Sequence, residues 1–155
     1  GVPSVYFFSL DAQGLASVTG ARLFHHLPYY YARIGLKMND GRVRFESRRR
    51  HPGARPGHYE ATYWPTGEPF DAPTDPLAEF LVERYRFYTE APDGTVRYTD
   101  VEHDPWTLYP AEATVKSDTL LRADGFARPD EEPVYYYSPG LDVVASRSKR
   151  LQEQS

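Results

Sequence analysis

The stretch YYYARIGLKMNDGRVRFESRRR (29–50) decides the fold, because it joins two alternating runs through a tight turn. Asn39-Asp40-Gly41 supplies residues that tolerate positive φ, which a two-residue hairpin turn requires. Side chains alternate between the two faces of a strand. We therefore expect one face of residues 29–38 to be core, namely Tyr30, Ala32, Ile34, Leu36 and Met38, and the other to carry Tyr29, Tyr31, Arg33, Gly35 and Lys37.

Further strands and a few short helices are expected along the rest of the chain. Apolar runs and turn residues predict a buried strand over 5–10, strands over 58–64, 106–109, 113–116 and 141–146, and a second hairpin over 86–102. Helices are expected over 15–24 after an Asp11 cap, over 75–84, and as a turn around 117–125. In and just after the helix over 75–84, helical spacing separates Leu77, Phe80, Leu81 and Tyr85. The pattern predicts an α+β domain, mainly antiparallel β and barrel-like, with two or three short helices.

Length and composition limit the organisation and the compartment. The 155 residues suit one domain over 1–146 followed by a polar tail over 147–155, and the Gly-Val-Pro start suggests part of a longer product. With no cysteine, disulfides, thiolate metal sites and a cysteine nucleophile are excluded, and we expect a cytoplasmic protein. The net charge of −4 gives no general attraction to nucleic acid. No run approaches the roughly 18 apolar residues of a membrane span.

The motifs then carry a family resemblance over nearly the whole chain. They are VYFFSLDA (5–12), ARLFHHLPYYYARI (21–34), SRRR (47–50), ATYWPTGEPF (61–70), PLAEFLVERYRFYT (76–89), HDPWTLYPAEA (103–113) and LDVV (141–144). Their order and spacing resemble the YqjF-like proteins of the DUF2071 family, a group without an assigned function. Those proteins usually carry another segment before the point where this chain starts. The family is similar in turn to the acetoacetate decarboxylase superfamily, which implies an antiparallel β-barrel around a small-molecule cavity.

The resemblance argues against the decarboxylase reaction itself. Acetoacetate decarboxylases form a Schiff base on a lysine in a Pro-Lys-Lys segment, and Pro28-Tyr29-Tyr30 looks like the counterpart of that segment. Tyrosine cannot form an imine, so acetoacetate decarboxylase activity is not expected. Lys37 shares the face of Tyr29, but a lysine at a hairpin end is expected to be solvated.

Five residues are the candidates for ligand binding: Tyr29, Tyr31, Arg33, His103 and Trp106. Tyrosine rings and a guanidinium can line a semi-polar cavity, where Arg33 would hold a carboxylate by two hydrogen bonds. The leading hypothesis is a non-catalytic binder of a small acid or carbonyl compound, without a cofactor. The alternative is an enzyme on such a substrate, with Tyr29 or His103 as its acid–base group. A structural domain with a filled core is the third hypothesis.

Metal and nucleic-acid sites are not predicted. His25 and His26 are adjacent, so their rings point apart, and no HxxH or HExxH spacing occurs. Six arginines between Arg42 and Arg55 form a local positive stripe, but the rest of the chain is acidic and matches no recognition module. A barrel lacking a strand would expose an edge and favour self-association, so a homo-oligomer is a further expectation.

Overall fold

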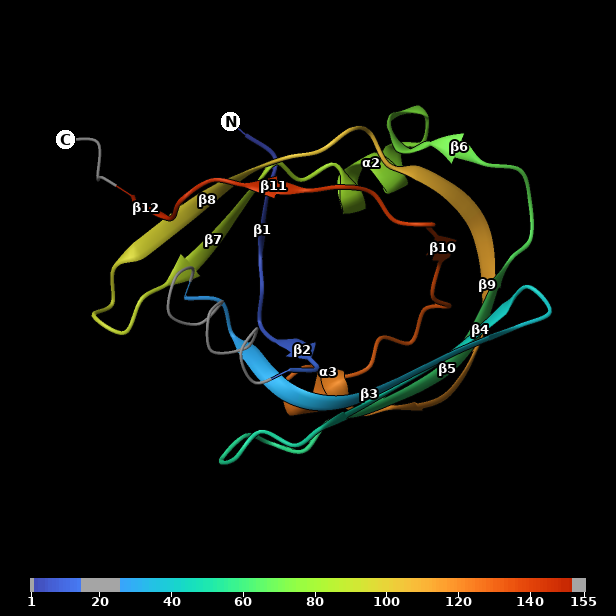
Figure 1. Cartoon of the computed structure of the whole chain (residues 1–155), viewed down its shortest axis with the longest axis horizontal. Helices are drawn as coiled ribbons and strands as arrows, with labels where there is room; N and C mark the ends of the chain where they lie inside the picture. Colours follow the sequence, from blue (N-terminus) through green and yellow to red (C-terminus); the bar gives the residue numbers. More distant parts are fainter. Residues whose placement is uncertain (1, 15–25, 152–155) are drawn as a thin grey trace.

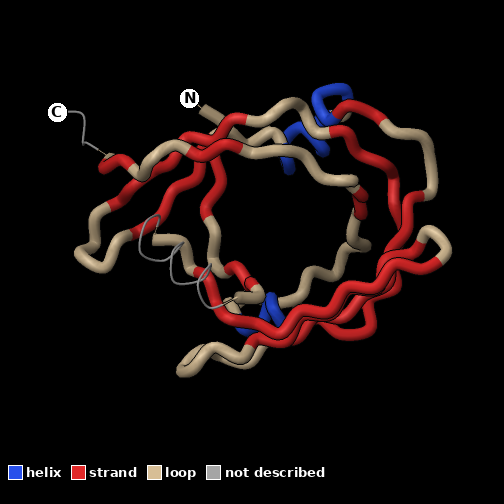
Figure 2. Tube along the Cα trace, viewed as in Figure 1, coloured by secondary structure: helices blue, strands red, loops and turns tan. Residues whose placement is uncertain are grey.

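The computed structural model describes residues 2–14 and 26–151. These residues form a mostly β structure with few helices, in which the larger sheet curls into a half-barrel (Figure 1). Figure 2 shows how far the strands dominate the regular structure. No helix among the described residues is long and apolar enough to cross a membrane.

The larger sheet has seven strands in the order β10-β9-β5-β4-β3-β2, with β6 paired to β9. Its strands are β2 (Leu10–Ala12), β3 (Tyr29–Asn39), β4 (Arg42–Arg49), β5 (His58–Pro65), β6 (Phe70–Asp71), β9 (Thr107–Asp118) and β10 (Tyr135–Tyr137). All pairs in this sheet are antiparallel except β2 with β3, which is parallel.

The smaller sheet has five strands in the order β1-β7-β8-β11, with β12 also paired to β8. They are β1 (Ser4–Tyr6), β7 (Arg86–Glu90), β8 (Val96–Glu102), β11 (Val144–Ala145) and β12 (Lys149–Arg150). The helical segments are η1 (Ala72–Thr74), α2 (Pro76–Val82) and α3 (Leu120–Ala123). Strand β12 lies in the expected polar tail, where Lys149 and Arg150 pair with Tyr98 and Arg97.

The two expected hairpins are confirmed. Asp40 and Gly41 both take positive φ, 47° and 72°, as the two-residue turn between β3 and β4 requires. Gly94 also takes a positive φ, 77°, in the longer turn between β7 and β8. The strand over 58–64 and the helical turn around 117–125 are also present, as β5 and α3.

The expected buried strand over 5–10 is wrong. The segment divides into β1, which pairs in parallel with β7, and β2, which pairs in parallel with β3. Because the chain passes from one sheet to the other between them, Phe8 is left exposed. Asp11 lies in β2, and the helix expected over 15–24 lies outside the described residues. The strands expected over 106–109 and 113–116 form one continuous strand, β9.

The core face predicted for residues 29–38 is buried at Ala32 but exposed at its far end, and the apolar side chains of α2 are exposed as well. In α2, Asp75 caps the helix by accepting a hydrogen bond from Ala78 N at 2.8 Å, as expected. It is the small Ala78, however, that packs into the core cluster, together with Ala72 and Leu108. Leu77, Phe80 and Leu81 are exposed, as are Leu36 and Met38 toward the free end of the β3–β4 hairpin.

An ion network lies on the inner face of the larger sheet, which we define as the face that carries the Arg49 side chain and looks toward α3 (Figure 1). The Arg49 side chain, only 3% exposed, donates from Nε to Asp11 Oδ1 at 2.7 Å and from Nη1 to Asp124 Oδ1 at 3.3 Å. Its Nη2 donates to Ser9 Oγ at 2.8 Å, and its Cζ lies 4.4 Å from the centre of the Tyr30 ring. One guanidinium thus joins β2, β4 and the residue that ends α3.

Replacement of Arg49 is expected to destabilise the domain strongly. In Arg49→Ala, Asp11 and Asp124 lose their cation while largely buried, and breaking such a pair lowers the free energy of unfolding by about 3–5 kcal/mol. Arg50→Ala is the control, because the neighbouring side chain is exposed and such changes stay within about 0.5 kcal/mol. Urea unfolding followed by circular dichroism measures both. Equal effects of the two substitutions would show that the network does not hold the fold.

Candidate functional site

A tyrosine-lined pocket of about 290 Å³ opens on the inner face of the larger sheet. Strand β5 contributes Tyr59 and Tyr63, β9 contributes Ala111 and Ala113, and the third side is formed by residues 135–138. Tyr63 lies directly opposite Ala113 in the sheet register. Because an alanine methyl is short, each such pairing leaves space beside the phenol ring. The pocket therefore has aromatic walls, small side chains between them, and several hydroxyl groups.

Two of the pocket phenols, Tyr59 and Tyr63, have a raised pKa and so keep their hydroxyl proton at physiological pH. Burial raises the pKa of Tyr59, with further contributions from Tyr135, Asp118 and Tyr63. Burial also raises the pKa of Tyr63, with a smaller contribution from Tyr137. Among the described residues, the hydroxyls of Tyr59, Tyr63, Tyr135 and Tyr137 have no hydrogen-bond partner. These donors are therefore available to a ligand oxygen.

Tyr136, between two of these tyrosines, has a different role. Its ring packs against Phe70 with centroids 5.7 Å apart, beside the core cluster. Its hydroxyl lies 3.5 Å from Asp75 Oδ1, at the cap of α2. Burial raises the pKa of Tyr136 as well, with further contributions from Asp75. Tyr136 thus borders the pocket and also anchors β10 to the α2 region.

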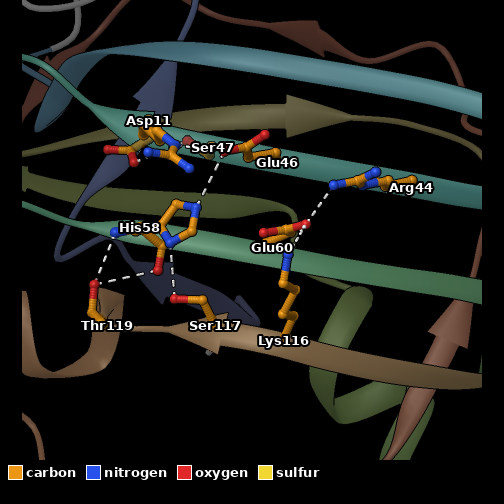
Figure 3. A network of polar contacts seen from close by, with 10 residues as sticks. Asp11, Arg44, Glu46, Ser47, His58, Glu60, Lys116, Ser117 and Thr119 are labelled. Carbon is orange, nitrogen blue, oxygen red and sulfur yellow. Dashed lines mark hydrogen bonds and ion pairs between the residues drawn. The ribbon is translucent and has the colours of Figure 1, made fainter.

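The opposite, outer face carries a polar network around His58 (Figure 3). His58 Nδ1 lies 2.9 Å from Ser117 Oγ, and its Nε2 lies 3.3 Å from Glu46 Oε1. Glu60 Oε1 accepts from Lys116 Nζ at 3.2 Å. A shift of register between Glu60 and Ala61 marks a β-bulge, so that both Lys116 and Ser117 reach this face from consecutive positions of β9.

Three potential metal ligands converge in this network. Within the described part of the chain, ligand atoms of Glu46, His58 and Glu60 lie within 4.8 Å of one another. Arg48, however, donates to Glu46 at 2.5 Å, and Arg44 donates to Glu60 at 2.7 Å. These hydrogen bonds are the main cause that lowers the pKa of each carboxyl. With Lys116, three cations face two carboxylates, which leaves no negative charge to attract a metal ion.

Arg33, Tyr29 and Tyr31 all lie in β3, as expected, but Arg33 points to the outer face. It is exposed, stands opposite Arg48 in the register, and borders a hollow of about 360 Å³. Tyr29 and Tyr31 are half-buried at the start of the same strand, where Tyr31 N donates to His51 Nδ1 at 3.2 Å. The tyrosine pocket thus lies on the opposite face of the sheet from Arg33. Ligand binding by Tyr29 and Tyr31 stays a prediction.

His103 and Trp106 lie together in the connection between β8 and β9, with ring centroids 6.0 Å apart. This connection runs on the opposite side of the ring from β3 (Figure 1). His103 stacks on Tyr85 with ring centroids 4.6 Å apart, and its Nδ1 lies 2.8 Å from the Asp104 carbonyl oxygen. The buried Glu83 accepts from Trp106 N at 2.9 Å and from the Tyr85 hydroxyl.

This second cluster has the character of a structural junction. The hydrogen bond to Glu83 raises the pKa of Tyr85 to about 12. Residues from the end of α2, the start of β7 and the connection between β8 and β9 meet in it. Trp106 Nε1 is buried without a hydrogen-bond partner among the described residues. Ligand contact by His103 or Trp106 stays a prediction.

Sequence reasoning missed the pocket tyrosines, although a signal was present. The run HYEATYW predicts a strand, and its alternation places Tyr59, Ala61 and Tyr63 on one face. The run Tyr135-Tyr136-Tyr137 forms a strand of only three residues, which is too short for an alternating pattern to predict it. No pattern in the sequence showed that these two tyrosine groups meet across β9.

The three lysines of the chain all lie away from the tyrosine pocket. Lys37 is exposed near the end of the β3–β4 hairpin, and Lys116 pairs with Glu60 on the outer face. Lys149 pairs with Asp100 at 3.0 Å in the smaller sheet. The pocket therefore contains phenols and no primary amine from a lysine.

Comparison with a solved structure supports the fold. The crystal structure of acetoacetate decarboxylase from Legionella pneumophila is similar to the chain with a TM-score of 0.53 at 13% sequence identity. The match covers 95% of this chain and 60% of that one. At this level of identity the likeness concerns the fold alone.

Comparison of sequences gives the family. A family model described as an uncharacterized conserved protein, DUF2071, matches residues 1–142. The uncharacterized protein YqjF of Bacillus subtilis (strain 168) is 38% identical over 144 residues, which cover 93% of this chain and 58% of that relative. The chain thus spans less than two thirds of the curated relative it matches. It belongs to the DUF2071 family of uncharacterized proteins and has an acetoacetate decarboxylase-like fold.

Proposed function

We propose that this domain binds a small uncharged carbonyl compound, without covalent catalysis, in the tyrosine pocket of its inner face. The observation that carries the proposal is the group of pocket phenols whose hydroxyls have no partner among the described residues. A pocket of about 290 Å³ is close to the lower end of ligand sites, which span roughly 300–1,000 Å³. The ligand is therefore small.

The chemistry of the lining favours a carbonyl group over an ionised acid. A phenol donates one hydrogen bond to a carbonyl oxygen, and aromatic rings and alanine methyls contact the apolar remainder of the ligand. Among the described residues, no arginine or lysine lines the pocket. A carboxylate would therefore lose hydration without gaining a cation, which is unfavourable in a partly dry site.

Covalent catalysis of the decarboxylase kind has no support at this pocket. A Schiff base needs a lysine, and each of the three lysines lies elsewhere. The alternative of acid–base catalysis by His103 is also less well supported, because its two ring nitrogens face the backbone carbonyls of Asp104 and Arg84. Binding is thus the simplest function that fits the geometry.

We include the closed barrel in the same proposal. The acetoacetate decarboxylase-like fold supports an arrangement in which the half-barrel sheet forms one wall around the inner face. Closure would shield the pocket from solvent and strengthen its hydrogen bonds. A homo-oligomer and a cytoplasmic location stay predictions from the sequence.

Filling the pocket is expected to abolish ligand binding. Ala113→Leu places a branched side chain beside Tyr63, whereas Thr114→Leu places the same side chain on the exposed outer face of the same strand. Binding of acetophenone, a neutral ketone, and of benzoate, an anion of similar shape, is followed by saturation-transfer NMR. We expect acetophenone to bind the wild type and Thr114→Leu more tightly than benzoate, and not to bind Ala113→Leu. Undiminished acetophenone binding by Ala113→Leu would refute the site.

Removing a single hydroxyl is expected to weaken binding modestly. Tyr63→Phe keeps the ring but loses one donor, so the dissociation constant for acetophenone should rise about two- to tenfold. Tyr109→Phe is the matched control, since Tyr109 packs on Tyr137 with centroids 6.0 Å apart but does not line the pocket. If both variants bind acetophenone as tightly as the wild type, the hydroxyls do not hold the ligand.

A further inference from the structure

We propose that the outer face of the larger sheet carries a separate binding site for a small anion, with Arg33, Arg48 and Arg50 as its cationic groups. These arginines, together with Ile34, Gly35 and Glu46, line the hollow of about 360 Å³ on β3 and β4. The ligand class is a small molecule with a carboxylate or phosphate group. Both are oxyanions that a guanidinium recognises through paired hydrogen bonds.

The first argument is the arrangement of the charges. Arg33 and Arg48 are directly opposite each other on antiparallel strands, and Arg50 lies just past the end of β4, where it lines the same hollow. Like charges that face each other across a sheet destabilise the pairing. Such a conflict between local sequence and stability is typical of a functional site.

The second argument is the lack of compensating carboxylates. Of the described residues that line the hollow, Glu46 alone is acidic, and it already accepts from Arg48 Nε at 2.5 Å. Among the described residues, neither the Arg33 nor the Arg50 guanidinium has a hydrogen-bond or ion-pair partner. Two unpaired cations thus face one small hollow. An oxyanion placed there would relieve their repulsion and accept hydrogen bonds from both.

The third argument is the shape of the hollow. Gly35 lies next to Arg33 on the same face, opposite Glu46, and a Cβ at Gly35 would meet nothing within 4 Å. A side chain at this position would extend from the end of the hollow that Arg33 and Glu46 border. The missing side chain therefore leaves room for a group of a few atoms beside the backbone.

This site is independent of the proposed carbonyl pocket. Arg33 and Arg48 point to the outer face, whereas Tyr59 and Tyr63 border the inner face of the same sheet. The two sites also differ in chemistry, because the hollow is cationic and the described residues that line the tyrosine pocket carry no charge. Loss of one site should leave the other intact, so the two proposals fail separately.

Isothermal titration calorimetry with inorganic phosphate and with citrate tests the proposal at low ionic strength. Arg33→Gln and Arg50→Gln should each weaken binding of the preferred anion about tenfold or more, as loss of a charge-assisted hydrogen bond does. The control Arg42→Gln removes the same charge at the far end of β4, where Arg42 stacks over Trp64. It should weaken binding less than about threefold, through screened long-range attraction alone.

The identity of the tighter anion then gives the chemical class. Preference for phosphate indicates a phosphorylated ligand, and preference for citrate indicates a carboxylic acid. No heat of binding with either anion would overturn the proposal. Equal weakening by Arg33→Gln and Arg42→Gln would overturn it too, because the arginines of this face would then act only as a diffuse positive field.

Thermal unfolding provides a second readout that does not depend on the calorimetry. Arg50→Gln removes one of the repelling cations, so we expect a higher midpoint temperature without anion and a smaller shift caused by phosphate or citrate. A lower midpoint in Arg50→Gln, with the anion-induced shift retained, would contradict the proposed repulsion and the site.

Discussion

The buried guanidinium of Arg49 is the interaction on which the arrangement of the larger sheet depends. Its partners come from β2 and from the residue that ends α3, two segments that are far apart in the sequence. A charge this deep is tolerated only if its donors are satisfied, and Asp11, Asp124 and Ser9 accept from all three guanidinium nitrogens. The network decides which face of β4 points inward. Once Arg49 is inside, Arg48 and Arg50 must point outward.

The local elements of this fold could be predicted from the sequence, because each has its own short-range signal. The Asp40-Gly41 turn, the Asp75 cap and the turn at Gly94 are set by backbone preferences of a few residues. The long-range pairing could not be predicted in the same way. The parallel contacts of β1 and β2, and the short strands β10 to β12, depend on partners elsewhere in the fold.

The candidate site was harder to predict, because it depends on which face of each strand points inward. Alternation correctly separates Tyr30 from Arg33, but alternation alone cannot tell the inside of a curled sheet from its outside. The expected cavity face of β3 is the one that carries the exposed Arg33. Tyr59 and Tyr63 lie on the inward face of β5, and a bulge in β9 lets Lys116 and Ser117 both serve the outer network. Both faces are therefore chemically distinct surfaces of one scaffold.

The pairing of β1 and β2 has a consequence for the order in which the chain folds. The β3–β4 and β7–β8 hairpins close through short turns, so they can form early and locally. Ser4, in contrast, pairs with Arg86, and Leu10 pairs with Tyr29, so the segment over 4–12 joins both sheets only after its partners exist. Long-range parallel pairing is intrinsically slow. The connection between the two sheets, and with it the burial of Asp11 against Arg49, therefore belongs to a late step of folding.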